Sequence, residues 1–157
     1  MTIVYIDMDN VLVDFRSGIE KLSPRVLKEY SGRYDEVPGI FAKMSPYPGA
    51  LDAFKWISKH SDCYILSTAP WGNPSAWSDK LEWVKKYLGP EARKRLILSH
   101  HKNLMKGDII IDDRTARGVS EFQGVHIHFG YDHITGKPNA FPSWEATIKE
   151  LRRLLVG

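Results

Sequence analysis

The sequence is poor in cysteine and has no long hydrophobic run. Its single cysteine, Cys63, excludes an internal disulfide and a metal site built from cysteines. Because Cys63 lies in an apolar stretch, we expect a buried, unreactive thiol. No stretch approaches the roughly 18 apolar residues that a membrane-spanning helix needs, and the N-terminus lacks the basic region of a signal peptide. We therefore expect a soluble, cytoplasmic protein with no membrane partner.

Repeats, low-complexity tracts and a strong charge of one sign are also missing. The 22 Lys and Arg residues against 19 Asp and Glu residues give a net charge of +3. This surplus is too small to indicate a nucleic-acid partner, although it allows a small anionic substrate. The 157 residues fit one globular domain, residues 1–157, and the composition excludes a disordered chain. The oligomeric state stays open.

Five short apolar runs alternate with segments in which apolar residues have helical spacing. The runs are rich in β-branched and aromatic residues, which favours strands at Ile3–Ile6, Cys63–Leu66, Leu96–Leu98, Ile109–Ile111 and Val125–Phe129. The helical segments are Ala50–His60, Trp77–Leu88 (with Leu81, Val84 and Leu88 inward), Thr115–Phe122 and Trp144–Leu155. This alternation predicts an α/β fold, a Rossmann-like three-layer sandwich. Its five-stranded parallel sheet has the strand order 5-4-1-2-3, counted along the chain, and helices cover both faces.

The segment from about Phe15 to Tyr47 interrupts this alternation. It holds one predicted helix, Ser17–Tyr30. In the stretch that follows, Ser31–Pro48, glycine and proline leave no clear strand. We therefore expect a small helical cap, residues 15–47, inserted after the first strand. Nearer the C-terminus, Ser143 is the expected N-cap of the last helix, and residues 130–142 read as a long surface loop.

Acidic and hydroxyl side chains follow the predicted strands where each strand ends. Asp7 and Asp9 follow the first strand, Ser67 and Thr68 end the second, and the pair Asp112-Asp113 ends the fourth. In a parallel α/β sheet the carboxyl ends of the strands form the ligand-binding edge, so these groups converge there. A single acid in such a place is usually a helix cap or a turn residue. Four together repel one another and need a cation, and oxygen ligands suit Mg²⁺.

These residue types suit the transfer of a phosphoryl group. A carboxylate at Asp7 can attack phosphorus, and Asp9, two residues further on, can protonate the leaving oxygen and later activate water. The phosphoryl oxygens need hydrogen-bond donors and positive charge. The hydroxyl of Thr68, backbone N–H groups such as that of Ala69, and a lysine can supply them.

Two lysines, Lys102 and Lys106, follow the third predicted strand and can face the same edge of the sheet. Lys102 is the better candidate and Lys106 its rival, and their spacing alone does not decide between them. The commonest state of either would be a solvated surface lysine.

The ordered set of motifs resembles the haloacid dehalogenase (HAD) superfamily of aspartate-nucleophile phosphatases. The motifs are Asp7-x-Asp9, Thr68 after a hydrophobic strand, Lys102, and Asp112-Asp113. More narrowly, four segments look like the 5'(3')-deoxyribonucleotidase branch, the cytosolic type C 5'-nucleotidases. These segments are Asp7–Phe15, Ser67–Trp71, Lys80–Leu88 and Gly107–Arg114. The resemblance covers nearly the whole chain.

The resemblance implies a role for each matching residue. Asp7 would be the nucleophile and a Mg²⁺ ligand, and Asp9 would be the acid and base that also gives its backbone carbonyl to the metal. Thr68 and Lys102 would hold the phosphoryl group. The resemblance selects Lys102 over Lys106, because the family's lysine stands ten positions before the first acid of the last pair. Asp113 would contact the metal directly, and Asp112 would support the site without direct contact with the metal.

Two departures from the family pattern are visible. Asn10 stands where the family commonly has glycine, and asparagine tolerates a left-handed backbone better than most residues. The cap is shorter than that of the animal deoxyribonucleotidases, in which the cap helps to select the substrate. The identity of the natural substrate therefore stays open.

Aromatic residues near the predicted edge are candidates for stacking on a nucleobase. Trp71, in the loop after the second strand, is the preferred one, and Phe15 is a further candidate contact together with Arg114. For Phe41 and the remaining aromatics we expect packing instead. His126 and His128 alternate on the last strand, and we expect packed or hydrogen-bonded histidines there, because no third metal ligand is near in sequence.

The sequence thus predicts a Mg²⁺-dependent phosphomonoesterase that forms an aspartyl-phosphate and acts on deoxynucleoside monophosphates. The alternatives are a phosphatase of another small ester, such as a sugar phosphate, a phosphatase of nucleic-acid ends, a phosphotransferase, or a non-catalytic binding protein. A signalling receiver domain is excluded because residues 98–102, after the third strand, contain no aspartate to accept the phosphoryl group.

Overall fold

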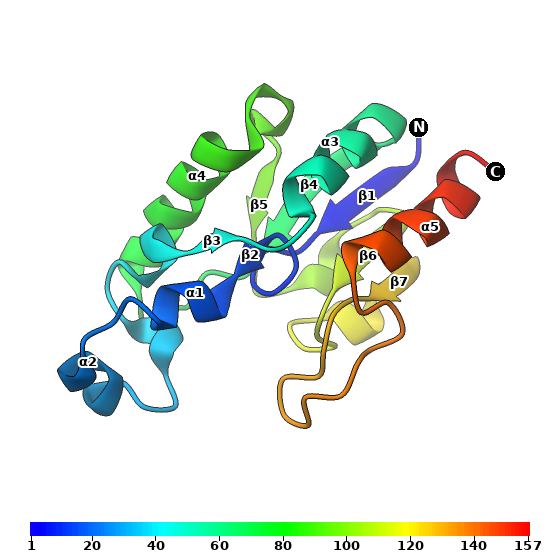
Figure 1. Cartoon of the computed structure of the whole chain (residues 1–157). Coiled ribbons are helices and arrows are strands. Elements are labelled where there is room, and N and C mark those ends of the chain that lie inside the picture. Colours follow the sequence, from blue (N-terminus) through cyan, green and yellow to red (C-terminus); the bar gives the residue numbers. More distant parts are fainter.

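A computed structural model describes all 157 residues and has a five-stranded parallel sheet at its centre. The strand order is β5-β4-β1-β6-β7, so that β1 lies between β4 and β6 (Figure 1). The strands are β1 (Ile3–Ile6), β4 (Asp62–Ser67), β5 (Leu96–Leu98), β6 (Ile109–Asp112) and β7 (Val125–His128). Their parallel register aligns Ile6 of β1 with Ile65 of β4 and with Ile111 of β6, which brings the ends of the central strands level.

These five strands are the ones that the sequence predicts, and the fold class is confirmed. When only these five strands are numbered along the chain, their order is 3-2-1-4-5. This is the predicted order 5-4-1-2-3 read from the opposite edge of the sheet. The labels run to β7 because two further short strands, β2 (Val13–Asp14) and β3 (Ser45–Pro46), pair antiparallel as a separate ribbon. The prediction that residues 31–48 hold no strand is wrong at β3, because Pro46 lies opposite Val13 in a ribbon too short to leave an alternating pattern.

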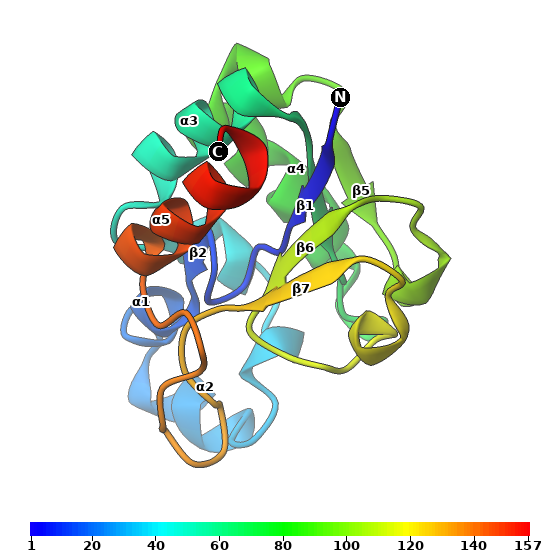
Figure 2. The same cartoon turned by 90° about the vertical axis from the view of Figure 1, so that its right-hand side faces the viewer.

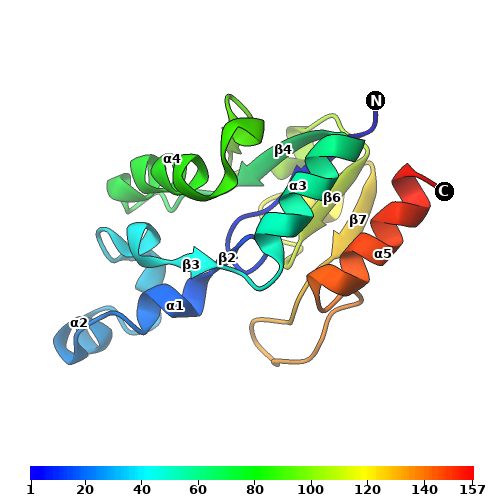
Figure 3. The same ribbon diagram turned by 45° about the horizontal axis from the view of Figure 1, so that its top comes forward.

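Three helices lie side by side on one face of the sheet: α3 (Ala50–His60), α4 (Pro74–Leu88) and α5 (Trp144–Leu155). Figures 1 and 3 show α3 between the other two. The predicted bounds of α3 and α5 are confirmed, and α4 begins three residues earlier than predicted, with Pro74 in its first turn. Ser143 caps α5, as expected, by accepting a hydrogen bond at Oγ from the backbone N–H of Ala146.

The main hydrophobic core lies between these helices and the sheet. Val4 and Ile6 of β1 point into it, whereas Tyr5 between them points to the opposite face, as the two-residue period of a strand requires. Phe54 of α3 is fully buried in this core. Cys63 is buried too, and burial raises the pKa of its thiol to about 12, so the expectation of an unreactive cysteine is confirmed.

The opposite face of the sheet, which we expected helices to cover as well, has no α-helix. Two short 3-10 helices, η4 (Lys102–Leu104) and η5 (Val119–Glu121), lie on this side, where Val119 and Phe122 pack on Tyr5 and Ile110. In Figure 2 the helices α3 and α5 lie to the left of β1, β6 and β7, away from this thin layer. The predicted helix Thr115–Phe122 is wrong, because Arg117 and Gly118 have φ angles of 59° and 89°, which a right-handed helix does not accommodate.

The segment between β2 and β3 lies beyond the carboxyl ends of the sheet strands, away from both termini (Figures 1 and 3). It contains α1 (Phe15–Ile19), α2 (Pro24–Glu29), η1 (Tyr34–Glu36) and η2 (Ile40–Lys43). The single helix predicted over residues 17–30 is wrong. Ser23 instead caps a new helix that has Pro24 at its first position, and proline has no N–H with which to continue the hydrogen bonds of α1.

This segment is tied to α4. The indole N–H of Trp83 donates to the carbonyl of Met44 at 3.0 Å. The amide of Asn73, just before α4, donates to the carbonyls of Asp35 and Val37 at 2.9 and 3.0 Å. These bonds hold the segment over the edge of the sheet at which the predicted site residues lie.

Two further segments complete the chain. The short η3 (Pro90–Ala92) links α4 to β5. Residues 130–142 form a loop, and its Asn139 donates a side-chain hydrogen bond to the carbonyl of Phe129 at 2.8 Å. None of the helices combines the length and the apolar character needed to cross a membrane.

We expect Phe54→Ala to lower the free energy of unfolding by about 3–5 kcal/mol, because it removes a fully buried ring and leaves a cavity. Urea denaturation followed by circular dichroism measures the change. The matched control is Lys55→Ala, an exposed neighbour on the same helix, for which we expect a change within about 0.5 kcal/mol. Equal effects of the two substitutions would contradict the assigned core.

Candidate active site

Asp7 and Lys102 form the centre of the candidate site. Asp7 directly follows β1, and its backbone N–H donates to the carbonyl of Ile111 on β6 at 2.9 Å, which extends the sheet by one residue. Its buried carboxylate accepts a hydrogen bond at Oδ1 from Nζ of Lys102 at 3.1 Å. Lys102 begins η4 and is itself buried. The same Nζ donates to Oδ2 of Asp112 at 2.6 Å, so one ammonium group joins two carboxylates.

Asp112 and Asp113, at the end of β6, complete a cluster of acids with Asp7. Their exposed fractions are 2% and 4%. Oδ1 of Asp112 accepts a hydrogen bond from the backbone N–H of Arg114 at 3.0 Å, which fixes its second oxygen. Asp7, Asp112 and Asp113 each present one oxygen within 4.8 Å of the others. Three acids that lie far apart in the sequence are thus close enough to share one cation.

The charges of this cluster do not balance. Burial raises the pKa of Asp112 and of Asp113, and the Asp7 carboxylate raises both further. Lys102 opposes the rise at Asp112 by charge and hydrogen bonding, whereas Asp113 has only the weaker effect of Arg114. A divalent cation would supply the missing positive charge. Because every donor is a carboxylate oxygen, the set fits a hard ion such as Mg²⁺.

Two histidines support the acids from β7. Nε2 of His126 hydrogen-bonds the carbonyl oxygen of Asp112, and Nε2 of His128 that of Asp113, both at 3.0 Å. A carbonyl oxygen only accepts, so each histidine carries its proton on Nε2 and donates it. The prediction of hydrogen-bonded histidines is confirmed, and their bonds hold the backbone from which the two acids project.

Asp9 lies on the tight turn that follows β1. Asn10 has a φ angle of 62°, so it adopts the left-handed conformation for which asparagine was expected to substitute for glycine. Oδ2 of Asp9 accepts a hydrogen bond from Nζ of Lys80 at 3.2 Å. Burial raises the pKa of Asp9, and the charge of Lys80 opposes that rise.

Lys80 is not among the site residues predicted from the sequence, although its position on α4 is a visible signal. Lys80 occupies the buried face of α4 together with Ala76, Trp83, Val84 and Leu88. Leu81, which we expected to face inward, is 41% exposed. A lysine at the core spacing of an amphipathic helix is unusual, because a buried ammonium needs partners. That position could have marked Lys80 as a site residue.

The predicted phosphate-binding residues lie at the ends of β4 and β5. Thr68 is half-buried, and its hydroxyl donates to the carbonyl of Ser99 at 2.8 Å, while Ala69 is buried. Lys106 is exposed and makes no ion pair, whereas Lys102 is buried on Asp7. The structure therefore brings Lys102 to the acids and leaves Lys106 outside the cluster.

The three predicted substrate contacts have different surroundings. Trp71 is 85% exposed, with its ring 6.0 Å from that of His100. The side chain of Arg114 is exposed as well, although its backbone N–H belongs to the acid cluster. Phe15 is half-buried against Phe41, with ring centroids 5.8 Å apart. Trp71 and Arg114 are thus open to a ligand, and Phe15 packs mainly within the segment over the site.

Comparisons with known proteins identify relatives of this chain. A sequence model of the family described as 5' nucleotidase, deoxy (pyrimidine), cytosolic type C protein matches residues 23–148. The chain belongs to this family. A "Putative 5'(3')-deoxyribonucleotidase" of Vibrio phage KVP40 is 59% identical over 149 residues, which cover 95% of this chain and 84% of that protein. The human 5'(3')-deoxyribonucleotidase, cytosolic type, is 30% identical in an alignment 149 residues long, in which 75% of this chain and 74% of that protein are covered.

Solved HAD hydrolases share the fold of this nucleotidase-family member. The "putative HAD-hydrolase YfnB" of Bacillus subtilis, in a magnesium-bound form, has a TM-score of 0.64 at 14% identity, with 99% of both chains covered. A haloacid dehalogenase-like hydrolase from Xanthomonas campestris has a TM-score of 0.54 at 12% identity, with 99% of this chain and 97% of that chain covered. The resemblance drawn from the motifs is confirmed at the level of family and fold.

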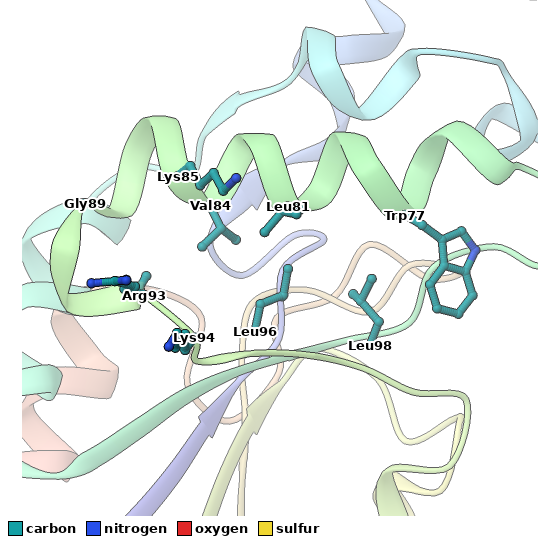
Figure 4. Close-up of a pocket in the computed structure, with 10 residues that line it drawn as sticks. Trp77, Leu81, Val84, Lys85, Gly89, Arg93, Lys94, Leu96 and Leu98 are labelled. Carbon is teal, nitrogen blue, oxygen red and sulfur yellow. The ribbon is translucent and has the colours of Figure 1, made fainter.

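A cavity of about 700 Å³ lies elsewhere in the protein, between α4 and β5. Figure 4 shows Leu81 and Val84 of α4 facing Leu96 and Leu98 of β5, with Trp77 at one end. None of the clustered acids lines it. The cavity is therefore separate from the carboxylate cluster.

The acid cluster gives the metal-free protein a particular dependence of stability on pH. The folded state binds protons at Asp112 and Asp113 more tightly than the unfolded state, because their pKa values are raised. Their contribution to stability therefore falls as pH rises above about 4, the ordinary value. In EDTA we expect the stability of Asp113→Asn relative to the wild type to increase as pH rises from about 4 towards about 9, the pKa of Asp113 in the folded protein. The gain should reach about 1.4 kcal/mol or more, the value of one pKa unit.

Urea denaturation at several pH values measures this difference in stability. Thermal unfolding with added Mg²⁺ then tests whether the cluster binds the cation. Mg²⁺ should raise the melting temperature of the wild type more than that of Asp113→Asn, because binding to the folded state alone stabilises it. The matched control is Asp52→Asn, which changes an exposed acid. A difference that does not vary with pH would contradict the assigned charge imbalance.

Proposed function

We propose that this protein is a Mg²⁺-dependent phosphomonoesterase that hydrolyses deoxynucleoside monophosphates through an aspartyl-phosphate on Asp7. The observation that carries the proposal is the buried cluster in which Lys102 joins Asp7 to Asp112. Membership of a deoxynucleotidase family supports the reaction class.

Asp7 suits the role of nucleophile. The residue is buried, and its Oδ1 accepts a hydrogen bond from Nζ of Lys102, which holds the carboxylate in place. The carboxylate attacks phosphorus, a new P–O bond forms, and the bond to the leaving oxygen breaks. Lys102 and the backbone at Thr68 and Ala69 stabilise the charge on the phosphoryl oxygens.

Asp9 suits the role of acid and then base. Burial raises the pKa of its carboxyl group, so that the protonated form is more readily available. Its proton passes to the leaving oxygen as the alcohol departs. The Asp9 carboxylate then takes a proton from a water molecule that attacks phosphorus, the bond to Asp7 breaks, and inorganic phosphate leaves.

The acids that stay ionised would hold the metal. Asp7 and Asp113 would contact it directly, Asp112 would support them, and the backbone carbonyl of Asp9 would add a further ligand. When bound, Mg²⁺ would supply positive charge that offsets the negative charge of the phosphoryl group. The histidines of β7 hold the backbone of Asp112 and Asp113 in position for this task.

A nucleotide substrate is supported by the names of the relatives and by the exposed ring of Trp71. A flat, accessible indole in the loop that follows β4 is a surface on which a base can stack. The segment between β2 and β3 lies over the same edge of the sheet and would limit the size of the substrate. A small monophosphate therefore fits better than a polymer end.

The test of substrate is phosphate release from a panel of phosphate esters in Mg²⁺ and in EDTA. The panel holds deoxynucleoside and ribonucleoside 5'- and 3'-monophosphates, sugar phosphates and a 5'-phosphorylated oligonucleotide. We expect the deoxynucleoside monophosphates to have the highest kcat/KM, and EDTA to remove activity. Faster release from sugar phosphates or from the oligonucleotide would identify one of the alternative substrates instead.

The test of the nucleophile is Asp7→Asn. We expect kcat to fall by about 10⁴-fold or more, because a neutral amide does not attack phosphorus. Circular dichroism and thermal unfolding establish that the variant is folded, and Asp52→Asn serves as the control with unchanged kcat. Substantial activity of folded Asp7→Asn would rule out the assignment.

A further inference from the structure

Lys80 is buried at the candidate site without belonging to the acid cluster. Its side chain is fully buried on α4, and its ammonium group donates three hydrogen bonds. The acceptors are Oδ2 of Asp9 at 3.2 Å, Oγ of Ser67 at 2.7 Å and the carbonyl of Thr68 at 3.0 Å. An ammonium group has three N–H bonds, so none remains for a substrate.

The Asp9 carboxyl group depends on this lysine. Its Oδ2 has Lys80 as its side-chain partner, and its Oδ1 is buried with no hydrogen-bond partner. The other lysine of the site, Lys102, is engaged with Asp7 and Asp112. Without Lys80, the side chain of Asp9 would therefore have no hydrogen bond to fix its orientation.

The segment over the site covers the same lysine. The ring of Phe41, on η2, lies 4.6 Å from Nζ of Lys80, and Phe41 is buried. A cation over an aromatic face is stabilised, and the ring keeps water away from the ammonium group. The attraction between Lys80 and Asp9 is stronger where water is excluded.

We propose that Lys80 is the positioning residue for Asp9. By tying the Asp9 carboxyl group to the end of β4, Lys80 holds it where it passes its proton to the leaving oxygen of the substrate. Lys80 does not itself touch the substrate. This inference rests on the proposed function, because it assigns a partner to the acid of that reaction.

The proposal predicts a dependence on the leaving group. A leaving oxygen of high pKa needs a proton as it departs, whereas p-nitrophenolate departs readily without one. A misplaced Asp9 therefore harms the first kind of substrate much more than the second. The quantity to compare is kcat/KM, which includes the departure of the leaving group and excludes the later hydrolysis of the aspartyl-phosphate.

The experiment measures kcat/KM of the wild type and of Lys80→Met for a series of substituted phenyl phosphates and for p-nitrophenyl phosphate, in Mg²⁺. We expect Lys80→Met to lose about 10²-fold for the poorest leaving group, the cost of a misplaced catalytic group, and less than about 10-fold for p-nitrophenyl phosphate. Lys86→Met, an exposed lysine of the same helix, is the matched control. We expect it to behave as the wild type.

A double-substitution cycle with Asp9→Asn separates positioning from a general loss of structure. If Lys80 acts through Asp9, Lys80→Met costs little more once Asp9 is replaced, so the two losses in kcat/KM do not add. Should Lys80→Met fail to fold, Lys80→Gln, which keeps N–H donors without the charge, is measured in the same way. Circular dichroism and thermal unfolding report folding.

The outcomes are distinct. Equal loss for every leaving group, or losses that add in the cycle, would overturn the role of Lys80 while the wild type remains an active phosphatase. Failure of the wild type to release phosphate from any ester would instead overturn the proposed function. A steeper dependence on the leaving group, together with losses that do not add, would establish the positioning role.

Discussion

The structure depends on the accommodation of several negative charges at one buried edge of a sheet. Asp7, Asp112 and Asp113 lie with oxygens within 4.8 Å of one another, and Asp9 is two residues from the first of them. Buried carboxylates are stable only with hydrogen bonds and positive charge. Lys102 gives both to Asp7 and Asp112, and Lys80 gives both to Asp9. The placement of η4 and α4, which carry these two lysines, is thus part of the same requirement.

The topology of the sheet makes this accumulation possible. With β1 between β4 and β6, the residues that follow these three strands lie level with one another. The acids come from β1 and β6, and the backbone of Thr68, at the end of β4, accepts a hydrogen bond from Lys80. The edge strand β7 adds His126 and His128, whose bonds to backbone carbonyls stiffen the end of β6. Local backbone geometry, such as the left-handed Asn10, then turns the chain away from the site.

Sequence patterns predict the parts of this arrangement that recur in every parallel α/β sheet. Short apolar runs locate the strands, and acids placed just after them belong to the ligand-binding edge. The patterns are less informative where a local choice decides. Ser23-Pro24 divides a segment that has helical spacing throughout, and the left-handed Arg117 and Gly118 prevent a helix that the apolar spacing favours. The patterns do not single out Lys80, because a lysine is normally solvated and the acceptors of Lys80 lie 12 to 71 residues away in the chain.

The two aspartates that are separated by one residue contact different lysines. Lys102 donates a hydrogen bond to Oδ1 of Asp7, the proposed nucleophile. At Asp9 the desolvation caused by burial exceeds the opposing effect of Lys80, so the pKa is raised, as suits an acid. Different environments thus suit the two aspartates to the two functions proposed for them. Because Lys80 is held by Ser67 and Thr68 and covered by Phe41, this division is linked to the end of β4 and to the segment above it. A change in that segment can therefore alter Asp9, the proposed acid, without touching Asp7, the proposed nucleophile.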